Sequence, residues 1–149
     1  MLQFGAPTPG KTHTPRPAAF GIAERQGRIA LVRVRPAAGG DWLDLPGGAV
    51  DPGEDETAAL VREFGEETGL VVAVGPVVVA FAQYFEKSDG QAVNNQGHVH
   101  VVTVEREDPA LKIEDDHALV WVDPADAVRT LRHDGHAWAV AKWMRGTGQ

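Results

Sequence analysis

The sequence contains no cysteine, and only one tyrosine and two methionines, among 149 residues. The lack of cysteine excludes disulfide bonds, thiolate metal ligands and thiol nucleophiles. No apolar run approaches the ~20 residues of a membrane-spanning helix, and the N-terminal segment has no signal-peptide core. Basic residues number 14 against 21 acidic ones, which argues against binding to long nucleic acids because these need a basic stripe. We therefore expect a cytoplasmic protein with neither a membrane nor a long nucleic acid as partner.

The length and the 43% apolar content are typical of one globular domain with its own core. Residues 1–17 are rich in proline, threonine and glycine and show no periodicity. We predict that they form a flexible or extended arm, pinned to the body near Pro15 and Pro17. Residues 18–149 are then a single domain.

The acidity of the chain is concentrated between Gly48 and Leu70. This stretch contains seven acidic residues and a single arginine. A polyanionic substrate would be repelled there unless a divalent metal ion lay between the two.

A helix is expected from Glu56 to Thr68. Turn-forming residues precede it, acidic residues crowd its start, and Gly69 follows as a helix-ending glycine. Apolar residues recur at helical spacing over the same range, with Leu60 and Phe64 the largest.

Three carboxylates of this helix can converge, because Glu66 and Glu67 follow Glu63 by three and four residues. Like charges so placed repel one another, which favours a bound cation. Oxygen ligands, with no cysteine and no histidine in the helix, indicate Mg²⁺ or Mn²⁺ rather than Zn²⁺. The alternative is a solvated acidic face of ordinary surface glutamates.

The spacing of these residues follows a known signature. Residues 48–70, GAVDPGEDETAALVREFGEETGL, match the box of the Nudix hydrolases at all seven fixed positions, with Phe64 and Leu70 in its apolar slots. Chance would produce such a match on the order of once in a hundred million starting positions. The chain thus resembles the Nudix family, and the solvated-face alternative loses its support.

The resemblance implies a site and a chemistry. Family members use divalent ions to cleave a pyrophosphate bond in a nucleoside diphosphate linked to another group. Glu63, Glu66 and Glu67 match the catalytic and metal-binding glutamates, with Glu66 as the candidate base, and the backbone carbonyl of Gly48 matches a metal contact. The ion pair of Glu54 with Arg62 matches a structural pair in the motif.

Many relatives add an acidic ligand from the loop before the last strand. Here Asp116 is the first candidate, and Glu114 and Asp115 are the second choices. The alternative is an ordinary exposed acidic turn.

Further candidates for substrate binding lie outside the motif. Arg33 and Arg35 alternate onto one face of a strand and could reach phosphates, or could simply be surface residues. Tyr84 and Phe85 could stack on a base or belong to the core. The polar segment 86–97 is a candidate substrate loop or a plain hairpin loop, and the histidines show no metal-ligand spacing that competes with the glutamates.

The predicted strands are 18–24, 28–35, 43–45, 98–106 and 119–122, together with 71–86, read as two strands divided by a turn at Gly75-Pro76. Helices are predicted at 56–68, 123–131 and 135–144. This order fits an α/β protein, and the resemblance implies the Nudix fold, an α/β/α sandwich with a central mixed sheet.

The leading hypothesis is a Mg²⁺- or Mn²⁺-dependent pyrophosphohydrolase whose partner is a small nucleotide, similar to the housecleaning type that hydrolyses nucleoside triphosphates, intact or oxidised. ADP-ribose, nucleotide sugars and dinucleoside polyphosphates stay open as substrates, as does a nucleotide-sensing domain without turnover. The leaving group, the phosphorus attacked and the identity of the base also stay open. The oligomeric state stays open too, and a homodimer is possible because many relatives are dimers. Prenyl diphosphate isomerisation is excluded because it needs a cysteine.

Overall fold

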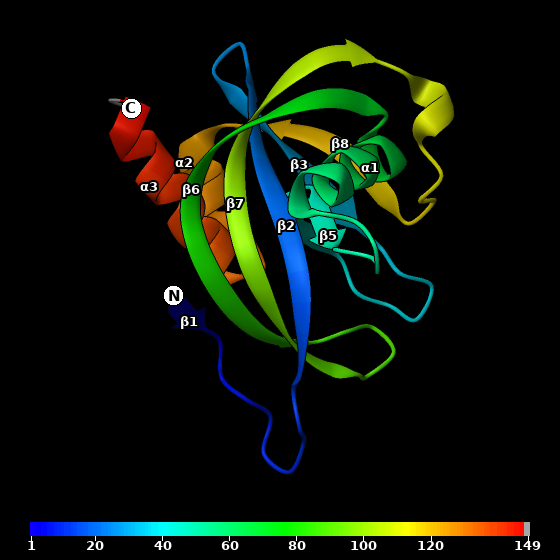
Figure 1. The fold of residues 1–149 in the computed structure, drawn as a ribbon, viewed down its shortest axis with the longest axis vertical. Coiled ribbons are helices and arrows are strands. Elements are labelled where there is room, and N and C mark those ends of the chain that lie inside the picture. The colour runs from blue at the N-terminus through cyan, green and yellow to red at the C-terminus, as the bar shows by residue number, and fades with distance from the viewer. Residues whose placement is uncertain (148–149) are drawn as a thin grey trace.

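Strand β2 (Thr14–Arg25) runs through the middle of a mixed sheet in the computed structural model, which describes residues 1–147 (Figure 1). It pairs in parallel with β7 and antiparallel with β3 and β5. The sheet has eight strands in the order β1-β6-β7-β2-β3-β4, with β5 beside β2 and β8 beside β3. The predicted domain, 18–149, ends outside the described residues.

The remaining elements, in chain order, are β1 (Leu2–Phe4), β3 (Arg28–Val34), β4 (Trp42–Asp44), β5 (Gly47–Ala49), α1 (Glu56–Thr68), β6 (Leu70–Glu86), β7 (Ala92–Glu107), a 3₁₀ turn at Pro109–Leu111, β8 (His117–Val122), α2 (Pro124–Thr130) and α3 (Asp134–Thr147). No helix within residues 1–147 is both long and apolar enough to span a membrane.

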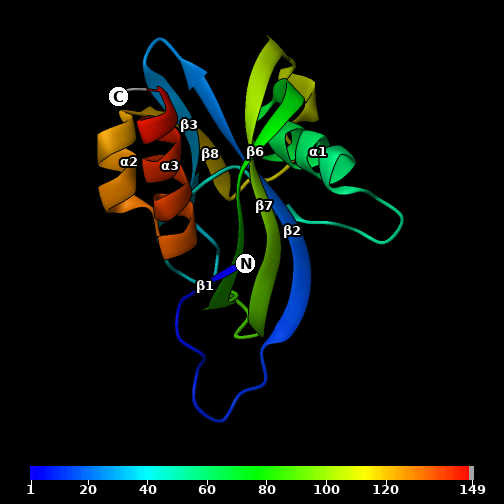
Figure 2. The ribbon, with the colours of Figure 1, turned by 60° about the vertical axis from the view of Figure 1, so that its left-hand side comes forward.

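The helices cover both faces of the sheet, α1 on one side and α2 with α3 on the other (Figure 2). Side chains of β2 point alternately to the two faces of the sheet, and each face carries its own hydrophobic core. Phe20 and Ile22 point toward α2 and α3, whereas Ala19 and Ala23 point toward α1. Gly21 lies in the α1 row, where a Cβ would stand 2.7 Å from the Phe64 ring. Small residues on this row thus let α1 pack close to the sheet. The predicted α/β/α sandwich with a mixed sheet is confirmed.

Helix α1 has the predicted bounds because both of its ends are determined locally. The Asp55 side chain accepts a hydrogen bond of 2.7 Å from the Ala58 N–H, which satisfies a free donor of the first turn. Gly69 ends the helix in the left-handed conformation, with φ of 75°.

The strands after α1 are longer than predicted. Residues 70–86 form one strand, because the chain passes Gly75 and Pro76 with irregular pairing to β7 instead of turning. Strand β7 begins at Ala92, so the connection shrinks from the predicted segment 86–97 to residues 87–91. Strand β5, at Gly47–Ala49, lies where the glycines predicted a loop.

The N-terminal segment is attached at both ends. Strand β1 pairs in parallel with residues 81–83 of β6, and β2 starts at Thr14, four residues before the predicted domain boundary. Pro15 and Pro17 lie in that strand, where the sequence predicted attachment. The flexibility of the segment between the two strands stays a prediction.

Candidate active site

Arg62 of α1 binds three of the glutamates in the motif. Its Nε and Nη2 donate to the two carboxylate oxygens of Glu54 at 2.8 and 2.9 Å. Its Nη1 donates to Glu63 at 2.9 Å and to Glu66 at 3.0 Å. The hydrogen bonds from Arg62 lower the pKa of Glu54 to about 2. The structure thus brings the predicted pair of Glu54 and Arg62 into contact, and their scaffold role stays a prediction.

Glu67 lies on the buried side of the helix, 6% exposed. One of its oxygens accepts a hydrogen bond of 2.9 Å from the Gly47 N–H, and the other lies 3.3 Å from His117 Nε2. Burial raises the pKa of Glu67 well above its ordinary value, and the nearby charge of Glu63 raises it further. Burial also raises the pKa of Glu63, against the opposing effect of Arg62. Two partly desolvated carboxylates therefore face each other.

Gly47 and Gly48 give these carboxylates room. A Cβ on Gly48 would lie 3.1 Å from the carboxylate carbon of Glu63. Gly47 has φ of +139°, and a Cβ there would lie 2.2 Å from the Ala19 carbonyl oxygen, so only glycine fits.

The loop before β8 brings further acidic groups to the same place. The backbone carbonyl of Glu66 accepts hydrogen bonds of 3.0 Å from the N–H groups of Ile113 and Glu114. Glu114 and Asp116 line the pocket beside Glu63 and Glu67. The side chains of Glu114, Asp116 and His117 offer potential ligand atoms within 4.8 Å of one another.

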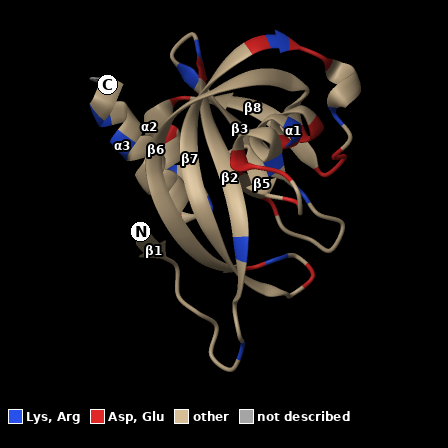
Figure 3. Cartoon of the chain, viewed as in Figure 1, with Lys and Arg blue, Asp and Glu red and all other residues tan. Residues whose placement is uncertain are grey.

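These residues form the acidic end of the pocket, comprising Glu63, Glu67, Glu114, Asp116 and His117. In Figure 3, many of the positions coloured as acidic lie on α1 and the adjoining loops. The ligands that the sequence predicted are brought together, apart from the carboxylate of Glu66, which binds Arg62 and does not line the pocket. The role of Glu66 as base stays a prediction.

The opposite wall of the pocket is cationic and aromatic. Arg132 donates to both oxygens of Asp44, at 2.8 and 3.2 Å. Its guanidinium lies 4.2 Å from the centre of the Trp42 ring and 5.4 Å from that of Phe85. The Arg16 guanidinium lies 5.6 Å from the centre of the Phe85 ring. Burial raises the pKa of Asp44, and Arg132 opposes this shift.

Two buried histidines lie behind this wall. His136 Nδ1 accepts a hydrogen bond of 3.2 Å from the Leu45 N–H, as only an unprotonated ring nitrogen can. Burial, assisted by the charges of Arg132 and Arg16, lowers the pKa of His133 to about 3. Both rings are therefore neutral near pH 7. We call this set the cationic end of the pocket: Arg16, Trp42, Asp44, Phe85, Arg132, His133 and His136.

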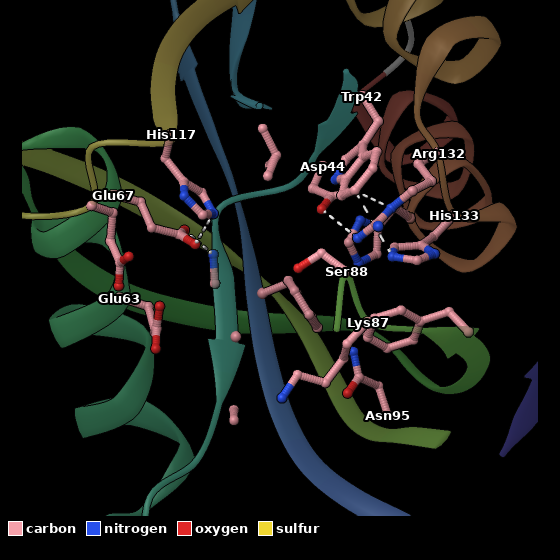
Figure 4. A pocket seen from close by; sticks show the side chains of 18 of the residues that line it. Trp42, Asp44, Glu63, Glu67, Lys87, Ser88, Asn95, His117, Arg132 and His133 are labelled. Atoms are coloured by element: carbon pink, nitrogen blue, oxygen red, sulfur yellow. Dashed lines mark hydrogen bonds and ion pairs between the residues drawn. The ribbon is translucent and has the colours of Figure 1, made fainter. Parts of the chain in front are cut away.

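The two ends face each other across a pocket of about 500 Å³. Figure 4 shows Glu63, Glu67 and His117 on one side and Trp42, Asp44, Arg132 and His133 on the other. Lys87 and Ser88, from the connection between β6 and β7, also line it, so part of the predicted substrate loop reaches the pocket.

Several predicted substrate contacts lie elsewhere. Arg33 and Arg35 form ion pairs of 3.7 and 3.2 Å with Asp41 and do not line the pocket. Tyr84 packs its ring against His13 instead. Of these candidates only Phe85 lines the pocket.

Sequence reasoning missed most of the cationic end. Arg16 fell within the predicted arm, and Asp44 and Arg132 belong to no motif. The one available signal for Arg16 was period-two alternation: it shares the face of β2 that carries Phe20 and Ile22.

The pocket thus sets clustered carboxylates against a cationic and aromatic wall, on an α/β/α sandwich. The family model described as NUDIX domain matches residues 12–144. The chain belongs to the Nudix family and is a pyrophosphohydrolase of that family.

Relatives agree with this assignment. The chain is 35% identical over 111 residues to CTP pyrophosphohydrolase of Escherichia coli K12, covering 72% of this chain and 76% of that protein. It is 39% identical over 102 residues to "Putative 8-oxo-dGTP diphosphatase 2" of Mycobacterium tuberculosis H37Rv, covering 66% and 65%. A NUDIX hydrolase structure from Nitrosomonas europaea superposes with a TM-score of 0.75 at 21% identity, over 89% of this chain and 90% of that one, and shares the fold.

Proposed function

We propose that this enzyme is a Mg²⁺- or Mn²⁺-dependent pyrophosphohydrolase of nucleoside triphosphates, intact or oxidised. The proposal is carried by the polarity of the pocket, which has clustered carboxylates at one end and stacked aromatic and guanidinium groups at the other. A nucleotide has the matching polarity, with phosphates at one end and a planar base at the other.

The acidic end suits hard divalent ions. Most of its donors are carboxylate oxygens, beside the His117 imidazole and the Gly48 carbonyl that the resemblance implies. Oxygen is the donor type that Mg²⁺ and Mn²⁺ prefer. Burial raises the pKa of both Glu63 and Glu67, and nearby negative charges raise it further, those of Glu66 and Glu114 for Glu63 and that of Glu63 for Glu67. A cation would relieve both effects. Glu63, Glu67 and Asp116 are the proposed ligands, with Glu66 able to join them if its carboxylate leaves Arg62. When bound, such ions neutralise phosphate charge and lower the pKa of attacking water.

The protein's own groups position the reaction. The Gly47 N–H and His117 hold the Glu67 carboxylate from two sides, which fixes its direction toward the pocket. Arg62 holds Glu63 in place. Lys87 of the β6–β7 connection lines the pocket and carries a charge that can contact the phosphates.

The cationic end suits a nucleobase. The Arg132 guanidinium lies over Trp42 and is held flat by its two hydrogen bonds to Asp44. Phe85 offers a further ring face, and base stacking on aromatic groups is worth ~1–3 kcal/mol per base. The Asn95 side chain accepts a 2.8 Å hydrogen bond from Arg16 through its oxygen, so its amide N–H groups stay available to a base.

The relatives support a triphosphate substrate, since two of them are named for CTP and 8-oxo-dGTP. The deciding experiment measures phosphate release from a panel of nucleotides, with a coupled phosphatase making every product visible. The panel contains nucleoside triphosphates, oxidised triphosphates, ADP-ribose, nucleotide sugars and dinucleoside polyphosphates, each with Mg²⁺, Mn²⁺ or EDTA.

We expect the highest kcat/KM with a triphosphate, and no activity with EDTA. A better rate with ADP-ribose, a nucleotide sugar or a dinucleoside polyphosphate would overturn the substrate assignment. Nucleotide binding without turnover of any panel member would favour the sensing alternative. The cytoplasmic location and the homodimer also stay proposals, the latter to be checked by light scattering.

A further inference from the structure

A second cluster of potential ligands lies outside the pocket, on the side of the sheet that α1 covers. It consists of Glu56 from the first turn of α1 and of His98 and His100 from β7. His98 Nδ1 lies 2.8 and 2.9 Å from the two oxygens of Glu56. His100 Nε2 lies 3.7 Å from Glu56 Oε1. None of the three residues lines the pocket.

The secondary structure explains why these side chains meet. His98 and His100 are two residues apart on a strand, so they project from the same face of the sheet. Val102 continues this row and packs in the core beneath α1. On the helix, Glu56 precedes Leu60 by four residues and therefore extends the stripe that faces the sheet. The apolar contact between α1 and β7 thus ends in two imidazoles and a carboxylate.

His100 is oriented as a metal ligand would be. It is only 9% exposed, and its Nδ1 lies 3.3 Å from the Gly75 carbonyl oxygen. A carbonyl only accepts, so this hydrogen bond places a proton on Nδ1, and the neutral tautomer that matches it has its lone pair on Nε2. That buried nitrogen has no hydrogen-bond partner among residues 1–147. Ligating histidines commonly donate their second ring N–H to a backbone carbonyl in this way.

We propose that Glu56, His98 and His100 bind a divalent transition-metal ion of the Zn²⁺ type. Metal–ligand distances of ~2.0–2.1 Å at a tetrahedral angle place two ligand atoms ~3.3 Å apart. The observed separations of 2.8 and 3.7 Å from Glu56 oxygens bracket this value, and all three ligand atoms lie within 4.8 Å of one another. Small side-chain rotations suffice to close the site.

This site has two imidazoles and one carboxylate, whereas the acidic end has four carboxylates and the single imidazole of His117. Imidazole ligands suit Zn²⁺, Ni²⁺ and Cu²⁺, whereas carboxylates and water suit Mg²⁺ and Mn²⁺. His98 and Glu56 are each about one third exposed, so the fourth position of a bound ion opens to water. The ion joins the start of α1 to β7 and stabilises the helix that carries Glu63 and Glu67.

The test is a Zn²⁺ titration of the full chain in excess Mg²⁺, with a chromogenic chelator as competitor. The same samples give the Tm, which Zn²⁺ raises if it binds the folded state. We expect one tightly bound Zn²⁺ at this site. His98→Ala and His100→Gln each weaken the affinity for Zn²⁺ by about tenfold to a hundredfold or more. Loss of a residue that only hydrogen-bonds to a metal ligand already has an effect of this size. Hydrolysis in Mg²⁺ stays unchanged in His98→Ala.

His117→Gln is the matched control, because it removes a histidine from the other three-ligand group, at the acidic end. It keeps the Zn²⁺ that His98→Ala loses. His98 is half-buried, so His98→Ala tests the site even if His100→Gln fails to fold. The proposal is overturned if wild type binds no Zn²⁺ in excess Mg²⁺, or if His98→Ala and wild type bind it equally well. In either case the contact between Glu56 and His98 is a hydrogen bond and not a metal site.

Discussion

Burial acts on both ends of the pocket, yet the two ends balance their charges differently. At the acidic end it raises the pKa of Glu63 and Glu67, and at the cationic end it lowers the pKa of His133 and His136. The cationic end has its counterion built in, since Arg132 binds Asp44. At the acidic end Arg62 reaches Glu63 but no hydrogen bond joins it to Glu67 among residues 1–147. Under the proposed function, the acidic end takes its cation from solution.

The two ends also have opposite effects on stability as pH changes. Glu67 is more easily protonated in the folded state, so its contribution is complete below its unfolded pKa of ~4.5 and is lost as pH rises through the raised value. His133 is harder to protonate when folded, so its contribution is complete above ~6.5 and is lost as pH falls toward about 3.

The largest expected effect is that of Glu67→Gln on catalysis. We expect kcat to fall about 10³-fold or more, because a preorganised ligand for the proposed ions is lost. The metal-free protein should become more stable near pH 8, since a buried charge is removed while Gln can still accept from Gly47. Each kcal/mol gained raises Tm by about 2–4 °C in a domain of this size.

The matched control is Glu105→Gln, which changes an exposed glutamate of β7. It should change neither kcat nor the Tm of the metal-free protein. Unchanged kcat in Glu67→Gln would remove Glu67 from the site, and a lower metal-free Tm would contradict the proposed repulsion.

The cationic end is best tested by His133→Gln. Between about pH 7 and pH 4, wild type should lose on the order of a few kcal/mol more unfolding free energy than the variant. Urea unfolding across a pH series in EDTA measures this. If the unfolding free energies of wild type and variant changed in parallel with pH, His133 would be protonated in the folded state without cost. The opposite pH dependence of the two ends would then be contradicted.

Arg132→Gln should destabilise the fold by about 2–3 kcal/mol, because Asp44, with its side chain 14% exposed, is left without its counterion. KM should also rise as the surface beside Trp42 is lost. Adding Asp44→Asn should restore part of the stability but not the KM. Equal stability of the single and double variants would show that Asp44 does not depend on Arg132.

The smallest expected effect is on KM, and it distinguishes an arginine that lines the pocket from one that does not. Arg16→Gln should raise KM about tenfold, which corresponds to ~1.4 kcal/mol, because Arg16 lines the cationic end. Arg33→Gln is its matched control and should leave KM unchanged, since Arg33 pairs with Asp41 at the surface. The reverse result would restore the contact predicted for Arg33 from the sequence.

Features determined by neighbouring residues could be predicted from the sequence. Helix α1 has the expected bounds because Asp55 and Gly69 cap it within its own turns. The meeting of Glu63 and Glu67 follows from helical spacing alone. The Gly75-Pro76 pair predicted a turn wrongly, because pairing with β7 carries the strand through that irregularity.

The cationic end could not be predicted because its residues converge only through the tertiary fold. Arg16, Asp44 and Arg132 come from three segments, and strand pairing brings Arg16 beside Asn95, another residue of the pocket lining. The cluster of Glu56, His98 and His100 was missed for a simpler reason. The alternate spacing of His98 and His100 is a strand pattern, and its third member, Glu56, comes from the helix above.

Strand β1 also has a consequence for how the protein can be handled. It occupies the end of the sheet beyond β6 and pairs with residues 81–83. Removing it would leave the backbone N–H and C=O groups of that edge open to a strand from another molecule. A shortened N-terminus would therefore expose this part of the β6 edge, and we expect self-association, rather than loss of the active site, as its first effect.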